Sequence, residues 1–177
     1  MKNEKKWYAL LTRSHFENTV HSAISRKSID VFLPTIKKQS RRRDRKIIIE
    51  APLFPGYVFV NISETPEEQL MVLKTIGAVR ILGYNNRPVE VPEAQIDSLK
   101  IITEHDADIV TGPDKSLKQG EMVLVTQGIF TGLQGEFLRY KGKDRVIVKI
   151  ETMGQFAGVE ISKKDIEKLP RHYSITP

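Results

Sequence analysis

Histidines and neighbouring carboxylates are the residues of this chain best able to bind a metal or transfer protons, and their spacing supports neither role. No histidine stands in a His-x-x-x-His or Glu-x-x-His pair with a further ligand; the four are His15, His21, His105 and His172. Asp106 and Asp108 could form a cation site, but an acidic linker explains them better, since two carboxylates alone specify no site. The chain has no cysteine, which excludes disulfides, Cys-based zinc sites and a thiol nucleophile. We therefore expect no metal.

Glycine-rich segments bind phosphate where a helix follows the loop, and this sequence offers no such place. Residues 128–135 read Gly-Ile-Phe-Thr-Gly-Leu-Gln-Gly, but they lie between two expected strands, with no helix N-terminus beside them. Neither a Gly-x-x-x-x-Gly-Lys-Ser/Thr loop nor a Gly-x-Ser-x-Gly motif occurs. The sequence thus predicts a protein that is not an enzyme and uses no cofactor.

A basic run is the strongest candidate for contact with nucleic acid. Seven of the ten residues 37–46 are Lys or Arg, and three of them are consecutive: Arg41, Arg42 and Arg43. Such a run repels itself and predicts an exposed loop or hairpin tip. Each of its cations could displace a counterion from a phosphate, so the run either contacts nucleic acid or another polyanion, or simply keeps the loop solvated.

Two apolar motifs could bind a protein partner. In the Pro-Leu-Phe-Pro-Gly-Tyr-Val-Phe-Val run at 52–60, strand alternation sends Tyr57 and Phe59 to one face and the valines to the other. The aromatic face is either a docking surface or core, and the pattern alone favours core. Phe130 lies between two glycines at an expected loop tip, where it either anchors a partner or folds back onto its own domain.

The elements around these motifs fall into two groups. The first 106 residues interleave strands and helices; we expect helices at 15–28, 66–76 and 92–104, and strands at 7–12, 29–33, 47–49, 57–60 and 78–82. Ser14 and Glu17 predict a capping box for the first helix. An inward face is expected on the second helix, made by Leu70, Leu73 and Ile76.

The later part of the chain predicts strands alone. Residues 107–118 lose periodicity and read as a linker, and residues 119–177 hold short strands separated by glycine turns. We therefore predict an α+β protein in which an antiparallel sheet flanked by helices (1–106) precedes a small SH3-like β-barrel (119–177).

Composition narrows the class of protein further. The chain has 177 residues, 40% of them hydrophobic, which is too apolar for a disordered chain, and no stretch approaches the ~18 apolar residues of a membrane span. The charged N-terminus is followed by no apolar h-region, so a signal peptide is not expected. The net charge of +6 is uneven, because residues 1–52 hold 13 Lys/Arg against 5 Asp/Glu. We expect a cytoplasmic monomer.

In their order and separation, several of these segments resemble the NusG/RfaH family of transcription elongation factors. The Trp-Tyr-Ala-Leu strand at 7–10, the run at 52–60 and the Pro-Val-Glu-Val-Pro segment at 88–92 resemble the family's N-terminal (NGN) domain. Residues 120–137 resemble its C-terminal KOW motif. The resemblance covers about residues 6–170 and implies a polymerase-binding NGN domain joined to a KOW barrel.

The resemblance also implies roles for individual residues. Factors of this family bind the clamp helices of RNA polymerase through an apolar pocket, which here matches Leu11, Phe54, Tyr57, Phe59 and Ile81. The positions that match the family's contacts with upstream and non-template DNA, with nascent RNA as a further possible ligand, are Arg13, Arg26 and Lys27. Phe130 matches the KOW loop aromatic that contacts ribosomal protein S10 or the termination factor Rho.

The branch of the family is indicated by details of the sequence. The segments at 12–17 and 31–34 and the basic run resemble specialised, operon-targeted paralogues, which suppress pausing and act as antiterminators on long operons. The stretch at 153–161 departs from the late KOW motif of general factors, which argues against contact with Rho. A general factor that couples polymerase to the ribosome or Rho is the alternative. A KOW-type RNA-binding or ribosomal protein is a further one, disfavoured because the basic excess is N-terminal.

Overall fold

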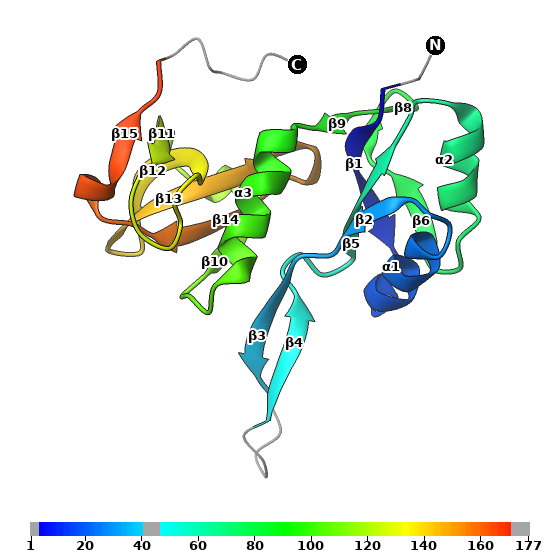
Figure 1. The fold of residues 1–177 in the computed structure, drawn as a ribbon, viewed down its shortest axis with the longest axis horizontal. Coiled ribbons are helices and arrows are strands. Elements are labelled where there is room, and N and C mark those ends of the chain that lie inside the picture. The colour runs from blue at the N-terminus through cyan, green and yellow to red at the C-terminus, as the bar shows by residue number, and fades with distance from the viewer. Residues whose placement is uncertain (1–3, 41–46, 171–177) are drawn as a thin grey trace. The chain divides into compact units, whose positions relative to one another are not determined.

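The computed structural model describes residues 4–40 and 47–170. The chain divides into two compact units, Met1–Val91 and Pro92–Pro177 (Figure 1), and each is described by itself. Both units are built on antiparallel sheets, so the predicted α+β class is confirmed.

The first unit is a sheet with two helices on one face. Its strand order is β2-β5-β1-β6, and β9 also pairs with β1; the strands are β1 (Lys6–Thr12), β2 (Asp30–Phe32), β5 (Tyr57–Ile62), β6 (Ala78–Ile81) and β9 (Glu90–Val91). The helices are α1 (Glu17–Ser25) and α2 (Pro66–Leu73).

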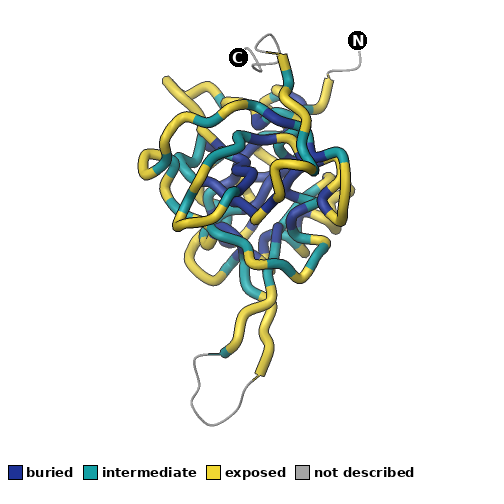
Figure 2. Tube along the Cα trace, turned by 90° about the vertical axis from the view of Figure 1, so that its left-hand side faces the viewer, coloured by how far each residue is buried: buried dark blue, intermediate teal, exposed yellow. Residues whose placement is uncertain are grey.

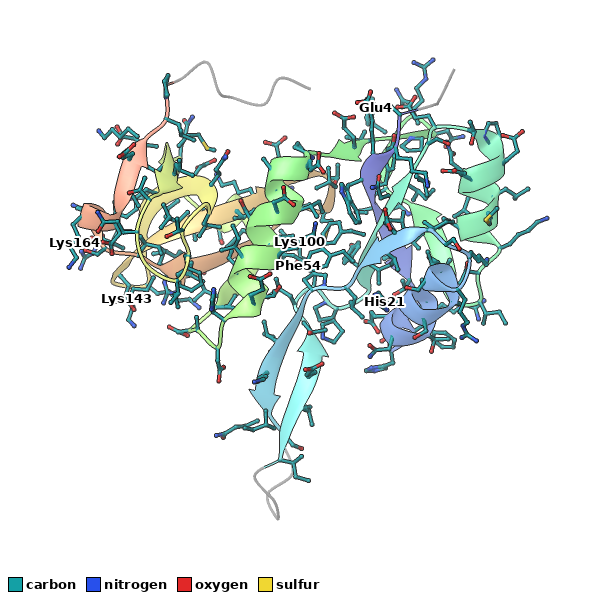
Figure 3. The ribbon with its side chains drawn as sticks, in the orientation of Figure 1. Glu4, His21, Phe54, Lys100, Lys143 and Lys164 are labelled. Carbon is teal, nitrogen blue, oxygen red and sulfur yellow. The ribbon has the colours of Figure 1, made fainter. Side chains whose placement is uncertain are left out.

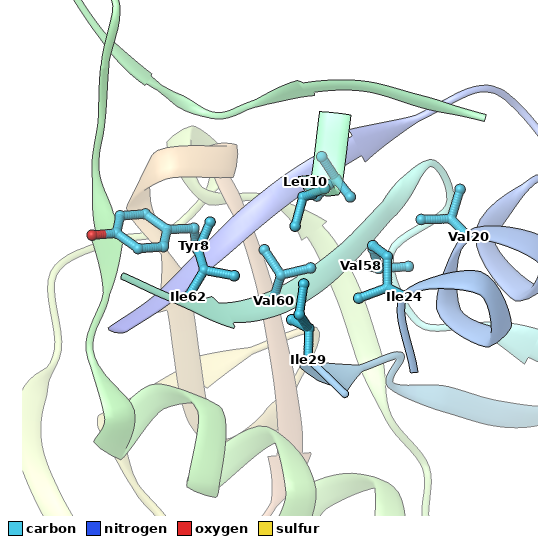
Figure 4. Close-up of a cluster of buried hydrophobic side chains, with 9 residues drawn as sticks. Tyr8, Leu10, Val20, Ile24, Ile29, Val58, Val60 and Ile62 are labelled. Atoms are coloured by element: carbon cyan, nitrogen blue, oxygen red, sulfur yellow. The ribbon is translucent and has the colours of Figure 1, made fainter. Parts of the chain in front are cut away.

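The core of the first unit lies between this sheet and the helices. Alternate residues of β1 and β5 supply one side of it, and α1 and α2 supply Val20, Ile24 and Val72 (Figure 4). The strand residues of this cluster are Tyr8, Leu10, Val58, Val60 and Ile62. Because strand side chains alternate, the intervening residues of both strands must lie on the opposite face.

Both expected helices of this unit form, but their details differ from the sequence prediction. The capping box at Ser14 is wrong: the N-cap of α1 is Phe16, without a side-chain cap, and the Glu17 carboxylate instead accepts a hydrogen bond from the Gly56 amide. The inward face expected for α2 is also wrong, because α2 faces the core through Val72. The three residues expected inside are exposed: Leu70, Leu73 and Ile76.

Two short ribbons extend from the sheet. One is formed by β3 (Thr35–Gln39) and β4 (Ile48–Pro52), and the other by β7 (Gly83–Tyr84) and β8 (Arg87–Pro88). The outer part of the β3–β4 ribbon is exposed along both strands (Figure 2). The sequence missed β3, because its alternation is interrupted by consecutive lysines.

The second unit is a six-stranded antiparallel sheet with one helix, α3 (Glu93–Glu104). The strand order is β10-β14-β13-β12-β11-β15; the strands are β10 (Val110–Pro113), β11 (Glu121–Val125), β12 (Gln134–Tyr140), β13 (Lys143–Ile150), β14 (Gln155–Glu160) and β15 (Ile166–Lys168). Single turns of 3-10 helix lie at η1 (Asp114–Ser116), η2 (Glu151–Met153) and η3 (Lys163–Asp165). The β-branched residues that favoured strands are the core of this sheet, for example Val146, Val148 and Val159.

The division between the units differs from the boundary expected at residue 106. Helix α3 contacts β12, β13 and β14, and the buried Ser98 hydroxyl accepts a hydrogen bond from the Gln134 amide at 3.1 Å. The expected linker contributes β10, which pairs with β14. Within it, Asp108 forms an ion pair of 3.1 Å with the buried Arg145. Periodicity alone could not reveal these partners, because a four-residue edge strand carries too little pattern.

Among residues 4–40 and 47–170, no helix is long and apolar enough to cross a membrane.

Candidate functional site

An aromatic face covers the side of the first unit's sheet that faces away from α1 and α2. The antiparallel register places Leu11 opposite Tyr57 and Ala9 opposite Phe59. Strand β2 adds Phe32 opposite Phe59. Since the neighbouring residues of each strand belong to the helix-covered core, these side chains share the other face.

Ring contacts unite this face. The rings of Phe32 and Phe59 stack at 6.1 Å with 25° between their planes. Phe54, which lies where the β3–β4 ribbon joins the sheet (Figure 3), meets Phe59 edge to face at 6.5 Å. Both geometries are favourable for aromatic pairs. We call Leu11, Phe32, Phe54, Tyr57 and Phe59 the aromatic face.

The members of the aromatic face differ in exposure. Phe54 and Phe59 are 1% and 0% exposed, whereas Leu11, Phe32 and Tyr57 are half-buried. Buried rings give the face a rigid base, and the half-buried side chains leave apolar area that a partner could cover. The arrangement can therefore bind an apolar protein surface.

A tight turn fixes the position of Tyr57. The Tyr57 amide donates a hydrogen bond to the Phe54 carbonyl at 3.2 Å, with Pro55 and Gly56 in the two central positions. Gly56 has a φ of 86°, which a type II turn requires at its third residue and which glycine adopts without strain. The turn is also tied to α1, because the buried Glu17 carboxylate accepts a hydrogen bond of 2.7 Å from the Gly56 amide.

One expected member of the site lies elsewhere. Ile81 is paired with Leu10 and packs against the core cluster on the helix-covered face. It therefore lies on the opposite side of the sheet from Tyr57 and Phe59. The reason is register: the pairing of β1 with β6 sets which residues of β6 share a face with Leu11, and Arg80 takes that place.

One member of the face was missed by the sequence prediction. Phe32 stands in an expected strand, but its neighbour Phe59 is 27 positions away, so only the β2–β5 register brings them together. Strand alternation did place Phe32 and Val31 on opposite faces, which is the one signal that could have found it.

Three cations form the candidate nucleic-acid contact of the described region. Arg13 follows β1, and its amide donates to the Gly77 carbonyl at 2.8 Å, while its side chain is exposed. Arg26 is exposed at the end of α1, where its Nε donates to the Ser22 carbonyl at 3.2 Å. These two guanidinium groups retain donors that could meet phosphates.

Lys27 has a structural task besides any ligand. Its ammonium donates to the Met71 carbonyl and to the Thr75 hydroxyl, both at 2.8 Å. It thus satisfies a carbonyl at the C-terminal end of α2, where a cation is favourable. Of its three N–H donors, one remains for a phosphate. Arg41, Arg42 and Arg43 lie outside the described residues.

Two hydrogen bonds beside the sheet perturb titrations. Burial, helped by the charge of Glu64, raises the pKa of Tyr8 well above its usual value, and the Tyr8 hydroxyl donates to Glu64 at 3.2 Å. At the same end of β1, a hydrogen bond to Glu90 raises the pKa of Lys6. Within the described residues, no group of three His, Asp or Glu side chains could hold a metal ion.

Comparison with known proteins identifies the family. A family model described as "Transcription termination factor nusG" matches residues 5–100, more than half of the chain. The chain belongs to the NusG family of transcription termination and antitermination factors. The transcription termination/antitermination protein NusG of Rickettsia bellii is 26% identical over 179 residues, covering 94% of this chain and 92% of that protein. The NusG protein of Helicobacter pylori strain J99 is 26% identical over 175 residues, covering 92% and 98%.

A solved NusG structure agrees with the fold. The structure titled "Domain interaction in Thermotoga maritima NusG" matches with a TM-score of 0.53 and 22% identity, over 94% of this chain and 98% of that chain. This likeness supports the assignment of the first unit's sheet to the NGN fold and of the second unit's sheet to the KOW fold.

In the KOW unit, Phe130 packs within its own unit. Its side chain is 7% exposed, and its ring meets His105 edge to face at 5.6 Å. Of the two alternatives left open by the sequence, the structure has the ring folded back. Its neighbour is the residue that follows α3, which the sequence had assigned to the other domain.

Proposed function

We propose that this NusG-family protein binds the clamp helices of transcribing RNA polymerase through its aromatic face, suppresses pausing and promotes antitermination on specific long operons. The observation that carries the proposal is the convergence of Leu11, Phe54, Tyr57 and Phe59 on one side of the sheet. NusG-family factors bind RNA polymerase, and the clamp helices are the surface that the resemblance of the sequence implies.

The physical basis is the burial of apolar area by a preformed surface. Helices of a partner can lay an apolar stripe on the aromatic face, where Phe54 and Phe59 are already fixed by packing. Tyr57 and Leu11 then lose their remaining exposure, and Tyr57 keeps a hydroxyl for a polar contact at the edge. Little conformational entropy is lost on binding, because the turn at Gly56 is tied to Glu17.

Nucleic acid is the second partner in this proposal. Arg13 and Arg26 would meet phosphates of upstream or non-template DNA, with Lys27 contributing its remaining donor. Arg41, Arg42 and Arg43 would add to the same electrostatic attraction. The protein needs no reaction step and no cofactor for this role, and it works where polymerase does, in the cytoplasm, as a monomer.

A general factor that couples polymerase to ribosomal protein S10 or Rho is the alternative. The buried ring of Phe130 weighs against it, because a partner that anchors on this ring must first separate it from His105. The specialised role is therefore the one we favour.

The test is binding to purified core polymerase, with two tyrosine variants of the full chain. Tyr57→Ala is expected to weaken binding at least tenfold, since an interface tyrosine in the centre of a contact typically contributes about 2 kcal/mol or more. Tyr84→Ala is the matched control, because Tyr84 is 76% exposed on the β7–β8 ribbon, away from the aromatic face. Equal affinity of both variants and wild type would overturn the proposal.

A further inference from the structure

The β3–β4 ribbon has two faces of different chemistry. The pairs Ile36–Ala51 and Lys38–Ile49 lie on one face, and the Ser40 amide donates to the Ile47 carbonyl to continue the ladder. The opposite face holds Thr35, Lys37, Gln39, Ile48 and Glu50. We call the first of these, with Ile36, Lys38, Ile47, Ile49 and Ala51, the isoleucine face.

The isoleucine face is exposed although it is apolar. Ile47 is 48% and Ile49 is 45% exposed. A two-stranded ribbon is marginally stable by itself and has no second layer to cover its side chains. Contiguous exposed apolar side chains on a projecting element are typical of a surface that a partner covers.

We propose that the isoleucine face of the β3–β4 ribbon is a second docking surface for RNA polymerase, on a protein patch with an apolar centre and an acidic rim. The inference rests on the proposed function, because it takes the polymerase as the partner. It goes beyond it by assigning the contact to an element separate from the aromatic face.

Charge selects this kind of partner. Lys38 stands within the isoleucine face, Lys37 lies beside it, and residues 37–46 of the sequence hold seven basic residues and one acidic residue. A second copy of the chain would bring two such runs together, which like-charge repulsion opposes. Carboxylates around an apolar patch would meet these lysines, so the complementary rim is acidic.

Nucleic acid fits this face poorly. A surface that binds the phosphate backbone carries several cations toward it, whereas the isoleucine face has Lys38 as its one cation among the described residues. Aliphatic side chains also lack the rings on which unpaired bases stack. Contact with protein is therefore what the apolar composition favours, and the adjacent basic run remains the candidate for DNA.

The expected effect follows from the area that is still exposed. Each of Ile47 and Ile49 is about half exposed, so a partner can bury roughly half of each side chain. Replacing both by serine should weaken polymerase binding about tenfold or more, from the free energy of burying aliphatic side chains. Ile48→Ser is the matched control, because Ile48 is more exposed, at 67%, but belongs to the other face.

The experiment combines affinity with cross-linking on the full chain and purified core polymerase. The Ile47→Ser/Ile49→Ser variant should bind about tenfold more weakly, Ile48→Ser should bind within about twofold of wild type, and a photo-crosslinking phenylalanine derivative at position 49 should attach to a polymerase subunit. The cross-link reports contact even if the double serine variant alters the ribbon.

Other outcomes would overturn the inference. Unchanged affinity of the double variant without a protein cross-link, or a cross-link to DNA alone, would exclude a protein partner at this face. Binding of phosphatidylglycerol vesicles that depends on Ile47 and Ile49, with polymerase affinity unchanged, would assign the face to lipid. If these results appear while Tyr57→Ala still abolishes binding, the proposed function stands and this inference fails. If wild type does not bind polymerase, both fail.

Discussion

Removal of the Glu17 carboxylate should loosen the turn that positions Tyr57. Glu17 is 5% exposed, and its Oε1 lies 2.7 Å from the Gly56 nitrogen. A hydrogen bond to a charged group contributes about 1.5–3 kcal/mol, and its loss leaves a buried N–H without a partner. Glu17→Ala should therefore accelerate hydrogen exchange of the Gly56 amide by about 10- to 100-fold, through easier local opening.

Amide exchange measured residue by residue on the full chain is the assay. Glu17→Gln is the informative companion, because its amide oxygen still accepts a hydrogen bond but carries no charge, so its effect should fall between wild type and alanine. Glu50→Ala, at an exposed position of the ribbon, should leave Gly56 unchanged. Unchanged exchange at Gly56 in Glu17→Ala would refute the reasoning, as would equal effects of alanine and glutamine. Polymerase affinity should follow the exchange rate, since a looser turn misplaces Tyr57.

Three further predictions concern stability. Burial raises the pKa of Tyr8 from 10.0, so the unfolded chain ionises first and the free energy of unfolding should fall as pH rises above 10 toward the folded-state value, measured by denaturant titration, and fall less in Tyr8→Phe. Asp108→Ala leaves the buried Arg145 without its ion-pair partner and should cost about 1–3 kcal/mol by thermal unfolding, whereas the exposed control Asp106→Ala should cost almost nothing. Ser98→Ala removes a buried acceptor of a β12 amide and should cost about 1 kcal/mol, seen as faster exchange of that amide; unchanged exchange would contradict the α3 contact.

The sequence predicted the elements whose pattern is local. The helix and strand periods located α1, α3 and most strands within a few residues, and the alternation in β5 placed Tyr57 and Phe59 on one face. The turn at Gly56 was also predictable, since Pro-Gly favours it.

The elements and contacts that the sequence missed depend on partners far away in the chain. Ile81 was assigned to the site by resemblance, but the β1–β6 register puts it on the other face. The role of Glu17 was misjudged because its carboxylate meets an amide 39 positions away instead of capping its own helix. Helix α3 was assigned to the first domain by its position, whereas its buried Ser98 bonds to β12.

Single-round transcription with the cognate polymerase tests the central claim most directly. The template carries pause sites and a terminator, and the comparison is between wild type, Tyr57→Ala and the control Tyr84→Ala, each shown to be folded by its amide spectrum. We predict shorter pauses and more read-through with wild type and with Tyr84→Ala, and loss of both effects with Tyr57→Ala. Longer pausing with wild type, or the same activity in Tyr57→Ala, would contradict antitermination through the aromatic face.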